Sequence, residues 1–311
     1  GMDVYIETTQ SRMGTFNNHT RKTLLWVFEQ FHTWDFLAAI GGDYFRLVVL
    51  FILVSIMLLA LTTGLTVYGL YWKSFKTVRQ KRKENGADDK RFIHRYHRQI
   101  GLIVSFIMLL FVTSAAFHLY VKLYNTNPEK KPYEQLIKRD QLGVSNLQLP
   151  VADSLIHKIS LADFSGHVYY QITNNKKQVL YFDAANGREL PNGDQQYAAY
   201  LSGYYGEGGL PVSINWITEF DNDYGFINKR LPVQKVSYAN GETRYIETTT
   251  AKLATKVAPL DRAEGLSFIF LHKFFWMTWA GKDIRDIVSM LCALGVLVVA
   301  LLGFVSFIKN K

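Results

Sequence analysis

The stretch LVVLFILVSIMLLALTTGLTVYGL, residues 47–70, contains no Asp, Glu, Lys or Arg. Two further stretches share this character, QIGLIVSFIMLLFVTSAAFHLYV at 99–121 and IVSMLCALGVLVVALLGFVSFI at 287–308. A helix needs roughly 20 apolar residues to cross the ~30 Å hydrocarbon core of a bilayer. The pattern therefore predicts a membrane protein with an α-helical bundle of three transmembrane helices, at residues 47–72, 98–122 and 285–308.

The segment between the first two predicted helices, 73–97, is strongly basic in a chain whose net charge is +9. Short loops rich in Lys and Arg stay on the cytoplasmic side. We therefore expect 73–97 to be a basic cytoplasmic loop and residues 1–46 and 123–284 to be external. Beside two spanning helices, the basic run 79–83 indicates an orientation signal or a contact with anionic lipid. The lipid bilayer is the expected partner, and no nucleic acid is expected.

The phrase YIETT occurs twice, at 5–9 and at 245–249, which are 240 residues apart. At the same offset both copies run into an apolar stretch. The other residues that coincide include His32 with His272 and Gly41 with Gly281. Internal repeats reveal how a chain is organised. The sequence thus contains parts of two equivalent units.

The external tail 1–46 is fairly polar, and no signal peptide precedes it. Because the repeat matches it to the end of the second unit, we expect this tail to be the end of a first external domain. Another helix and the rest of that domain are then expected upstream of Met2. Residues 123–284 are expected to hold a complete external domain and an interfacial segment.

The sequence pattern of the external region predicts a small α+β domain with antiparallel strands. The stretch HVYYQITNNKKQVLYFDAANGREL, 167–190, alternates and contains turn signals, as a β-hairpin does. A second strand pair is predicted at 231–239 and 243–257, around Asn-Gly. Short helices are predicted at 150–162 and 192–203. The region shows no Ser/His/Asp order, no Gly-rich phosphate loop and no Cys motif, so no catalytic residue is assigned.

The hairpin stretch resembles the PepSY domain, whose strand, polar turn and second strand end in a similar Asp…Gly phrase. The membrane segments resemble the PepSY-associated transmembrane family of bacterial inner membranes. The motifs that carry this likeness are HRYHRQIGL (94–102), AAFHLY (115–120), LHKFFW (271–276) and its first copy FHTWDF (31–36). The resemblance covers essentially the whole chain. One departure is Thr113-Ser114, where a Thr-Gly pair is common, and another is a missing first helix.

The resemblance implies an iron-regulated membrane protein or a siderophore-iron reductase of the bacterial inner membrane, with b-type haem (haem b) as its cofactor. The candidate axial ligands of the haem iron are His118, His272, His32, His97 and His94. Since a haem with two axial imidazoles needs ligands that face each other, one haem is expected to use His118 with His272 or with its repeat His32. The aromatic residues expected to pack against it are Phe117, Phe274, Phe275 and Trp276.

The topology puts His32, His118 and His272 at the outer face and the other two at the inner face. His97 and His118 are 21 residues apart in one helix, which is about 31 Å at 1.5 Å per residue. An inner haem would pair His97 with His94 or with a ligand from the missing helix. Ionisable residues inside membrane segments are functional by default, because burying their charge is costly.

Simpler readings stand beside this one. His94 and His97 lie among arginines and could be interfacial anchors, and His157 and His167 are expected on the surface. Cys292 is expected to be a small apolar residue. Two functions follow: outward electron transfer that reduces a ferric siderophore or another iron chelate in the periplasm, with no donor named, or a non-enzymatic membrane-anchored module that binds a peptide, a protease or an assembly partner.

Overall fold

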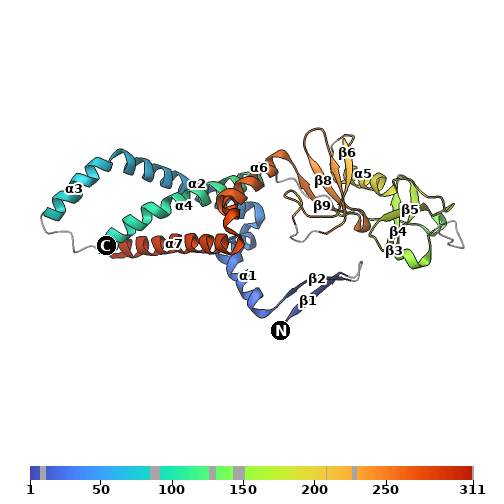
Figure 1. Ribbon diagram of the computed structural model, residues 1–311, viewed down its shortest axis with the longest axis horizontal. Helices are drawn as coiled ribbons and strands as arrows, with labels where there is room; N and C mark the ends of the chain where they lie inside the picture. Colours follow the sequence, from blue (N-terminus) through green and yellow to red (C-terminus); the bar gives the residue numbers. More distant parts are fainter. Residues whose placement is uncertain are drawn as a thin grey trace. The chain divides into compact units, whose positions relative to one another are not determined.

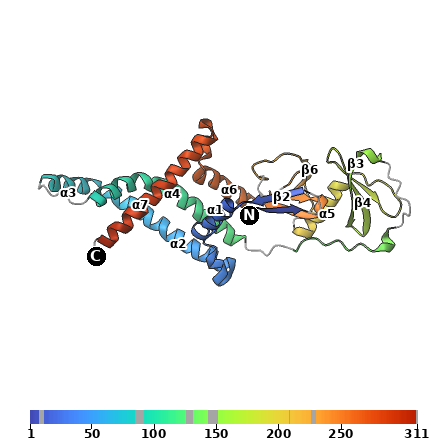
Figure 2. The ribbon, with the colours of Figure 1, turned by 90° about the horizontal axis from the view of Figure 1, so that it is seen from below.

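The computed structural model describes residues 1–7, 12–84, 92–125, 131–142, 151–207, 209–225 and 230–309. Within its helices and strands, it leaves out the side chains of residues 7, 12, 79, 82–83, 92–99, 153, 306 and 309. The chain divides into two compact units (Figures 1 and 2). The α+β unit comprises Gly1–Lys22 and Pro128–Arg262, and the helical unit comprises Thr23–Asn127 and Ala263–Lys311.

Among its described residues, the helical unit contains three helices that are long and apolar enough to cross a membrane. They are α2 (Phe36–Leu70), α4 (Phe92–Tyr124) and α7 (Lys282–Lys309). Their spans have mean hydropathies of 2.7, 2.5 and 2.8. α4 contacts both α2 and α7, and Figure 2 shows α7 crossing it. No residue of α2 is buried within the chain, and so large an exposed apolar surface suits lipid better than water.

The remaining helices of this unit are shorter. They are α1 (His19–Phe31, which begins in the α+β unit), α3 (Trp72–Glu84), α6 (Pro259–Ser267, which also begins there), the π-helical turn η6 (Phe268–His272) and the 3₁₀ turn η7 (Phe275–Ala280). The basic segment 73–97, expected as a loop, is therefore helical at 73–84, in α3, and at 92–97, in α4. Its Lys, Arg, Gln and Glu residues are good helix formers, which explains the difference.

The described residues of the α+β unit form three antiparallel sheets. The first pairs β1 (Asp3–Glu7) with β2 (Arg12–Asn17). The second has the order β3-β4-β5, from Ile156–Phe164, His167–Asn174 and Val179–Asp183. The third has the order β6-β7-β8-β9, from Ser213–Ile217, Val233–Ser237, Thr243–Glu247 and Lys252–Val257. Short 3₁₀ turns lie at Arg139–Gln141, Asp153–Leu155 and Thr248–Thr250.

Helix α5 (Gly193–Tyr205) packs against strands of both larger sheets. Its Tyr197 is fully buried and stacks on Phe164 of β3 with ring centroids 4.8 Å apart. Phe164 also stacks on Tyr169 of β4 at 4.6 Å. The core of this unit is thus aromatic, and it joins the two sheets through one helix.

The structure confirms the hairpin within 167–190 and the helix near 192–203, as β4–β5 and α5. The helix predicted at 150–162 is wrong. Most of that segment is strand β3, because pairing with the whole of β4 outweighs local preference. The single strand predicted at 243–257 is two strands, β8 and β9, joined by the turn at Thr248–Thr250.

The 240-residue repeat is also a structural repeat. In β1–β2, Tyr5 pairs with Thr15, Ile6 pairs with Met13, and the register shifts between Tyr5 and Ile6. The β8–β9 pair repeats this, since Tyr245 pairs with Thr255, Ile246 pairs with Leu253, and the register shifts between Tyr245 and Ile246. The two hairpins therefore have the same pairing pattern, with a register shift at the equivalent position. Their burial differs: Tyr245 and Ile246 are fully buried, whereas Tyr5 and Ile6 are 53% and 66% exposed.

The repeat continues into the helical unit. Trp34 and Phe274, 240 residues apart, both adopt positive φ, at 53° and 51°. Two glycines also have positive φ: Gly42 (81°), which interrupts α2 before its apolar stretch, and Gly281 (84°), which directly precedes α7. These two are 239 residues apart, so Gly41 is not the structural counterpart of Gly281. Between the residue with positive φ and the glycine, the first copy (Trp34 to Gly42) is one residue longer than the second (Phe274 to Gly281).

Candidate functional site

Two repeat-related histidines face each other in the helical unit. In the first copy Phe28 stacks on His32, four residues later, with ring centroids 4.8 Å apart. In the second copy Phe268 stacks on His272 in the same way, at 5.1 Å. The rings of His32 and His272 are themselves in edge contact, with centroids 6.3 Å apart and an interplanar angle of 68°. The repeat thus brings one imidazole from each copy to a common site.

The third histidine of this site comes from α4. His118 Nδ1 lies 2.7 Å from Glu264 Oε1, a carboxylate of α6. With Nδ1 as the donor to that carboxylate, His118 Nε2 is left free to accept or to bind a ligand. A carboxylate on the second ring nitrogen is the usual partner of a metal-binding histidine, because it fixes the tautomer and the orientation of the ring.

His272 lies at the centre of the three histidines. Its pKa is lowered by burial and further by the charges of His32, Lys273 and His118. The imidazole is therefore held in its neutral form, which is the form that binds metals. Among the residues that the structure describes, its buried Nδ1 has no hydrogen-bond partner. A buried polar atom left unpaired is costly, and a ligand bonded to Nδ1 would remove that cost.

Aromatic side chains enclose the central histidine. Phe111 of α4 lies against His272 with ring centroids 4.9 Å apart, and Phe274, which is 3% exposed, stacks on Phe111 at 5.6 Å. Phe111 and His118 are seven residues apart, which places both on one face of α4. One side of the site is therefore apolar, and Glu264 contributes a carboxylate beside His118.

These residues fit a b-type haem. Two imidazoles bound to one metal ion through nitrogens at about 2.0 Å have ring centroids about 6 Å apart, close to the spacing of His32 and His272. Within the described residues no group of three or more His, Cys, Asp or Glu is arranged to hold a metal ion. A haem iron needs only two protein ligands, and the imidazoles and flanking Phe rings provide the donors and the apolar packing.

The structure brings together three of the five candidate ligands. The side chains of His94 and His97 lie outside the described residues, so a site at the other end of α4 stays a prediction. Of the aromatic residues expected near a haem, Phe274 lies at the site, and Phe275 instead lies under the guanidinium of Arg285, 4.3 Å away.

Sequence reasoning missed four residues of the site. Phe28 and Phe268 were detectable, because they coincide at the offset that relates His32 to His272. Phe111 was detectable from its spacing to His118. Glu264 carries no local signal, because its role depends on the contact between α4 and the turn η6 that follows α6.

The chain was compared with family models, curated proteins and solved structures. No family model, no curated protein and no solved structure matches it.

Proposed function

We propose that the protein is a b-type haem protein of a bacterial inner membrane that passes electrons outward to a ferric siderophore or another iron chelate. The single observation that carries this proposal is the cluster of His32, His118 and His272. Two of these histidines are related by the internal repeat, and one is bonded to a carboxylate. The resemblance to PepSY-associated membrane proteins supports it.

The proposed topology follows from charge. The basic segment 73–97 is assigned to the cytoplasm and the α+β unit to the periplasm. This would put the histidine cluster at the periplasmic face. Cysteine labelling in a Cys292→Ala background tests the assignment. Reagent added from outside should label a cysteine at position 192 and not one at position 85, and the reverse pattern would overturn the topology.

The sequence makes His118 the ligand common to both pairings. We propose His272 in that place instead, because it is central to the cluster and its free imidazole is held neutral. The second ligand is His118 or His32. A bound haem supplies one-electron redox chemistry at this site. Glu264 holds the orientation and proton of His118, and Phe111 and Phe268 exclude water from His272. Burial and hydrogen bonds to the ligands set the redox potential of such a site.

The visible spectrum of the purified protein tests the proposal. The dithionite-reduced protein should show the bands of a low-spin b-type haem. His272→Ala should lose that low-spin signal, and one of His118→Ala and His32→Ala should lose it as well. His157→Ala is the matched control, because it removes an exposed histidine of the α+β unit.

Two results would overturn the proposal. One is a protein that contains no haem with every histidine intact. The other is a His272→Ala spectrum that keeps its amplitude and low-spin character. Oxidation of the reduced haem by a ferric siderophore, followed by stopped-flow absorbance, then tests the proposed substrate.

The alternative is a non-enzymatic, membrane-anchored PepSY-like module that binds a peptide, a protease or an assembly partner. The α+β unit favours this as a second candidate, because it has its own aromatic core and its own cavity. A protein without haem that captures a defined partner through this unit would support the alternative.

A further inference from the structure

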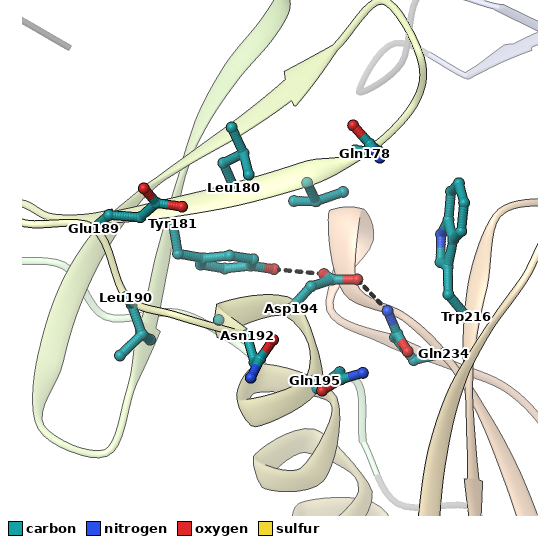
Figure 3. Close-up of a pocket in the computed structure, with 12 residues that line it drawn as sticks. Gln178, Leu180, Tyr181, Glu189, Leu190, Asn192, Asp194, Gln195, Trp216 and Gln234 are labelled. Atoms are coloured by element: carbon teal, nitrogen blue, oxygen red, sulfur yellow. Dashed lines mark hydrogen bonds between the residues drawn. The ribbon is translucent and has the colours of Figure 1, made fainter. Parts of the chain in front are cut away.

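The α+β unit contains a cavity of about 370 Å³ that the haem proposal does not use. It lies between strand β5, the start of α5, and strands β6 and β7 (Figure 3). Its volume falls within the range of small-molecule sites, which is roughly 300–1,000 Å³. The cavity lies wholly within one unit, so its shape depends on that unit alone.

The lining of this cavity is polar and acidic. Carboxylates come from Glu189 and Asp194, and carboxamides come from Gln178, Asn192, Gln195 and Gln234. Among the described residues that line it, none is Lys, Arg or His. A cleft lined by one sign of charge attracts ligands of the opposite sign.

Asp194 is the centre of the polar lining. Tyr181 donates its hydroxyl to Oδ1 at 3.0 Å, and Gln234 donates Nε2 to Oδ2 at 2.5 Å. Figure 3 shows both bonds inside the cavity. Both donors are neutral, so neither balances the charge of the carboxylate. Burial accordingly raises the pKa of Asp194.

Gln234 supplies an independent sign of a ligand. The residue is 4% exposed and its side chain points from β7 into the cavity (Figure 3). Because Nε2 is committed to Asp194, Oε1 must act as the acceptor. Within the described part of the chain, this buried Oε1 has no hydrogen-bond partner. Buried acceptors are nearly always paired in folded proteins, so the site calls for a donor from outside.

The walls of the cavity suit an organic cation rather than a metal ion. The indole of Trp216 lies across from Asp194 in Figure 3, and aromatic faces attract ammonium and guanidinium groups. Leu180 and Leu190 provide apolar surface for an aliphatic stem. A carboxylate, an unpaired carbonyl and an indole together match a group that has positive charge and several N–H donors.

We infer that this cavity binds a guanidinium or primary ammonium group on a short aliphatic stem, either free or as the side chain of a peptide. The cation lies between Asp194 and Trp216 and donates to the Asp194 carboxylate and to Gln234 Oε1. This site is separate from the histidine cluster, and its occupancy does not depend on haem.

Isothermal titration calorimetry on the full chain in detergent tests the inference. The probes are agmatine, N-acetyl-arginine amide and an Arg-containing tripeptide, and N-butylurea serves as the uncharged probe of similar shape. The cationic probes should bind and N-butylurea should not. Tighter binding of the tripeptide than of agmatine would identify a peptide as the source, and the opposite order would identify a free amine.

Asp194→Asn removes the charge and should weaken agmatine binding at least about tenfold, as the loss of a charge-assisted bond does. Glu219→Gln makes the same charge change at an exposed residue that does not line the cavity, and it should leave the affinity unchanged. Trp216→Leu should also weaken agmatine binding. Because Trp216 is 42% exposed, this variant tests the inference if Asp194→Asn does not fold. Equal binding of N-butylurea, or unchanged affinity in the folded variants, would overturn the inference.

Discussion

Replacing Arg244 with Met is expected to destabilise the α+β unit strongly. The Arg244 side chain is 2% exposed. Its guanidinium donates to the carbonyl oxygens of Ser202, Gly206 and Glu207, at 2.6, 2.9 and 2.7 Å, where α5 ends. It also forms an ion pair with Glu242, with an N–O distance of 2.6 Å. One buried cation therefore joins strand β8 to the C-terminal end of α5, the helix that packs against strands of both larger sheets.

Met fills the space of the aliphatic stem but provides no donor. Glu242, whose side chain is 14% exposed, would lose its close partner, and three carbonyl oxygens would lose a charged donor. Breaking a buried ion pair by removing one partner costs about 3–5 kcal/mol. Domains are stable by only about 5–15 kcal/mol. With a urea m-value of about 2 kcal/mol per molar, the unfolding midpoint should fall by about 2 M.

Pulse proteolysis of the full chain in detergent, across a urea series, measures this midpoint for the α+β unit. Lys256→Met is the matched control, because Lys256 Nζ is 4.0 Å from the same Glu242 carboxylate but its side chain is 50% exposed. Exposed pairs contribute at most about 1 kcal/mol, so its midpoint should move by less than about 0.5 M.

The double variant Arg244→Met, Glu242→Gln separates the two parts of the cost. Because the unpaired carboxylate is then gone, its midpoint should lie above that of Arg244→Met alone. The reasoning is refuted if Arg244→Met lowers the midpoint no further than Lys256→Met does.

Three further predictions concern the same unit and the histidine cluster. Gly193→Ala should lower the free energy of unfolding by about 1–3 kcal/mol, because the new Cβ would lie 2.7 Å from the Cβ of buried Tyr181. Gly203→Ala is the control in the same helix, since its Cβ meets open space and should not destabilise the unit. Equal urea midpoints for the two variants would contradict this. Burial raises the pKa of Asp194 above its ordinary value of 3.8. The stability contributed by the protonated carboxyl is therefore complete below that value and is lost as the pH rises through the folded pKa. Asp194→Asn should gain stability relative to the native chain as the pH rises above 3.8, and a difference independent of pH would count against this. Glu264→Gln should weaken haem binding about 10–100-fold in a haem titration, and an unchanged affinity would show that this carboxylate does not support a ligand.

The long apolar helices and the hairpin of the α+β unit were predictable because each depends on local pattern. In lipid, an uncharged run such as 47–70 satisfies its own backbone hydrogen bonds only as a helix. The alternation within 167–190 places one face of each strand in a core wherever the strands are paired. The offset that relates His32 to His272 was likewise visible in the order of residues, because a repeated unit repeats its environment.

What tertiary structure alone decided is which distant groups meet. Segment 156–164 became a strand because β4 offers it a full set of partners, although its own residues also allowed a helix. The Glu264 carboxylate lies beside His118, 146 residues away in the chain, because the turn η6 that follows α6 contacts α4. Gln234 donates a hydrogen bond to Asp194, 40 residues away in the chain, because β7 lies beside the start of α5. Hydrogen bonds and ring contacts act over a few ångströms, so the spacing of residues along the chain determines them only within one helix, one hairpin or one repeat, and packing determines the rest.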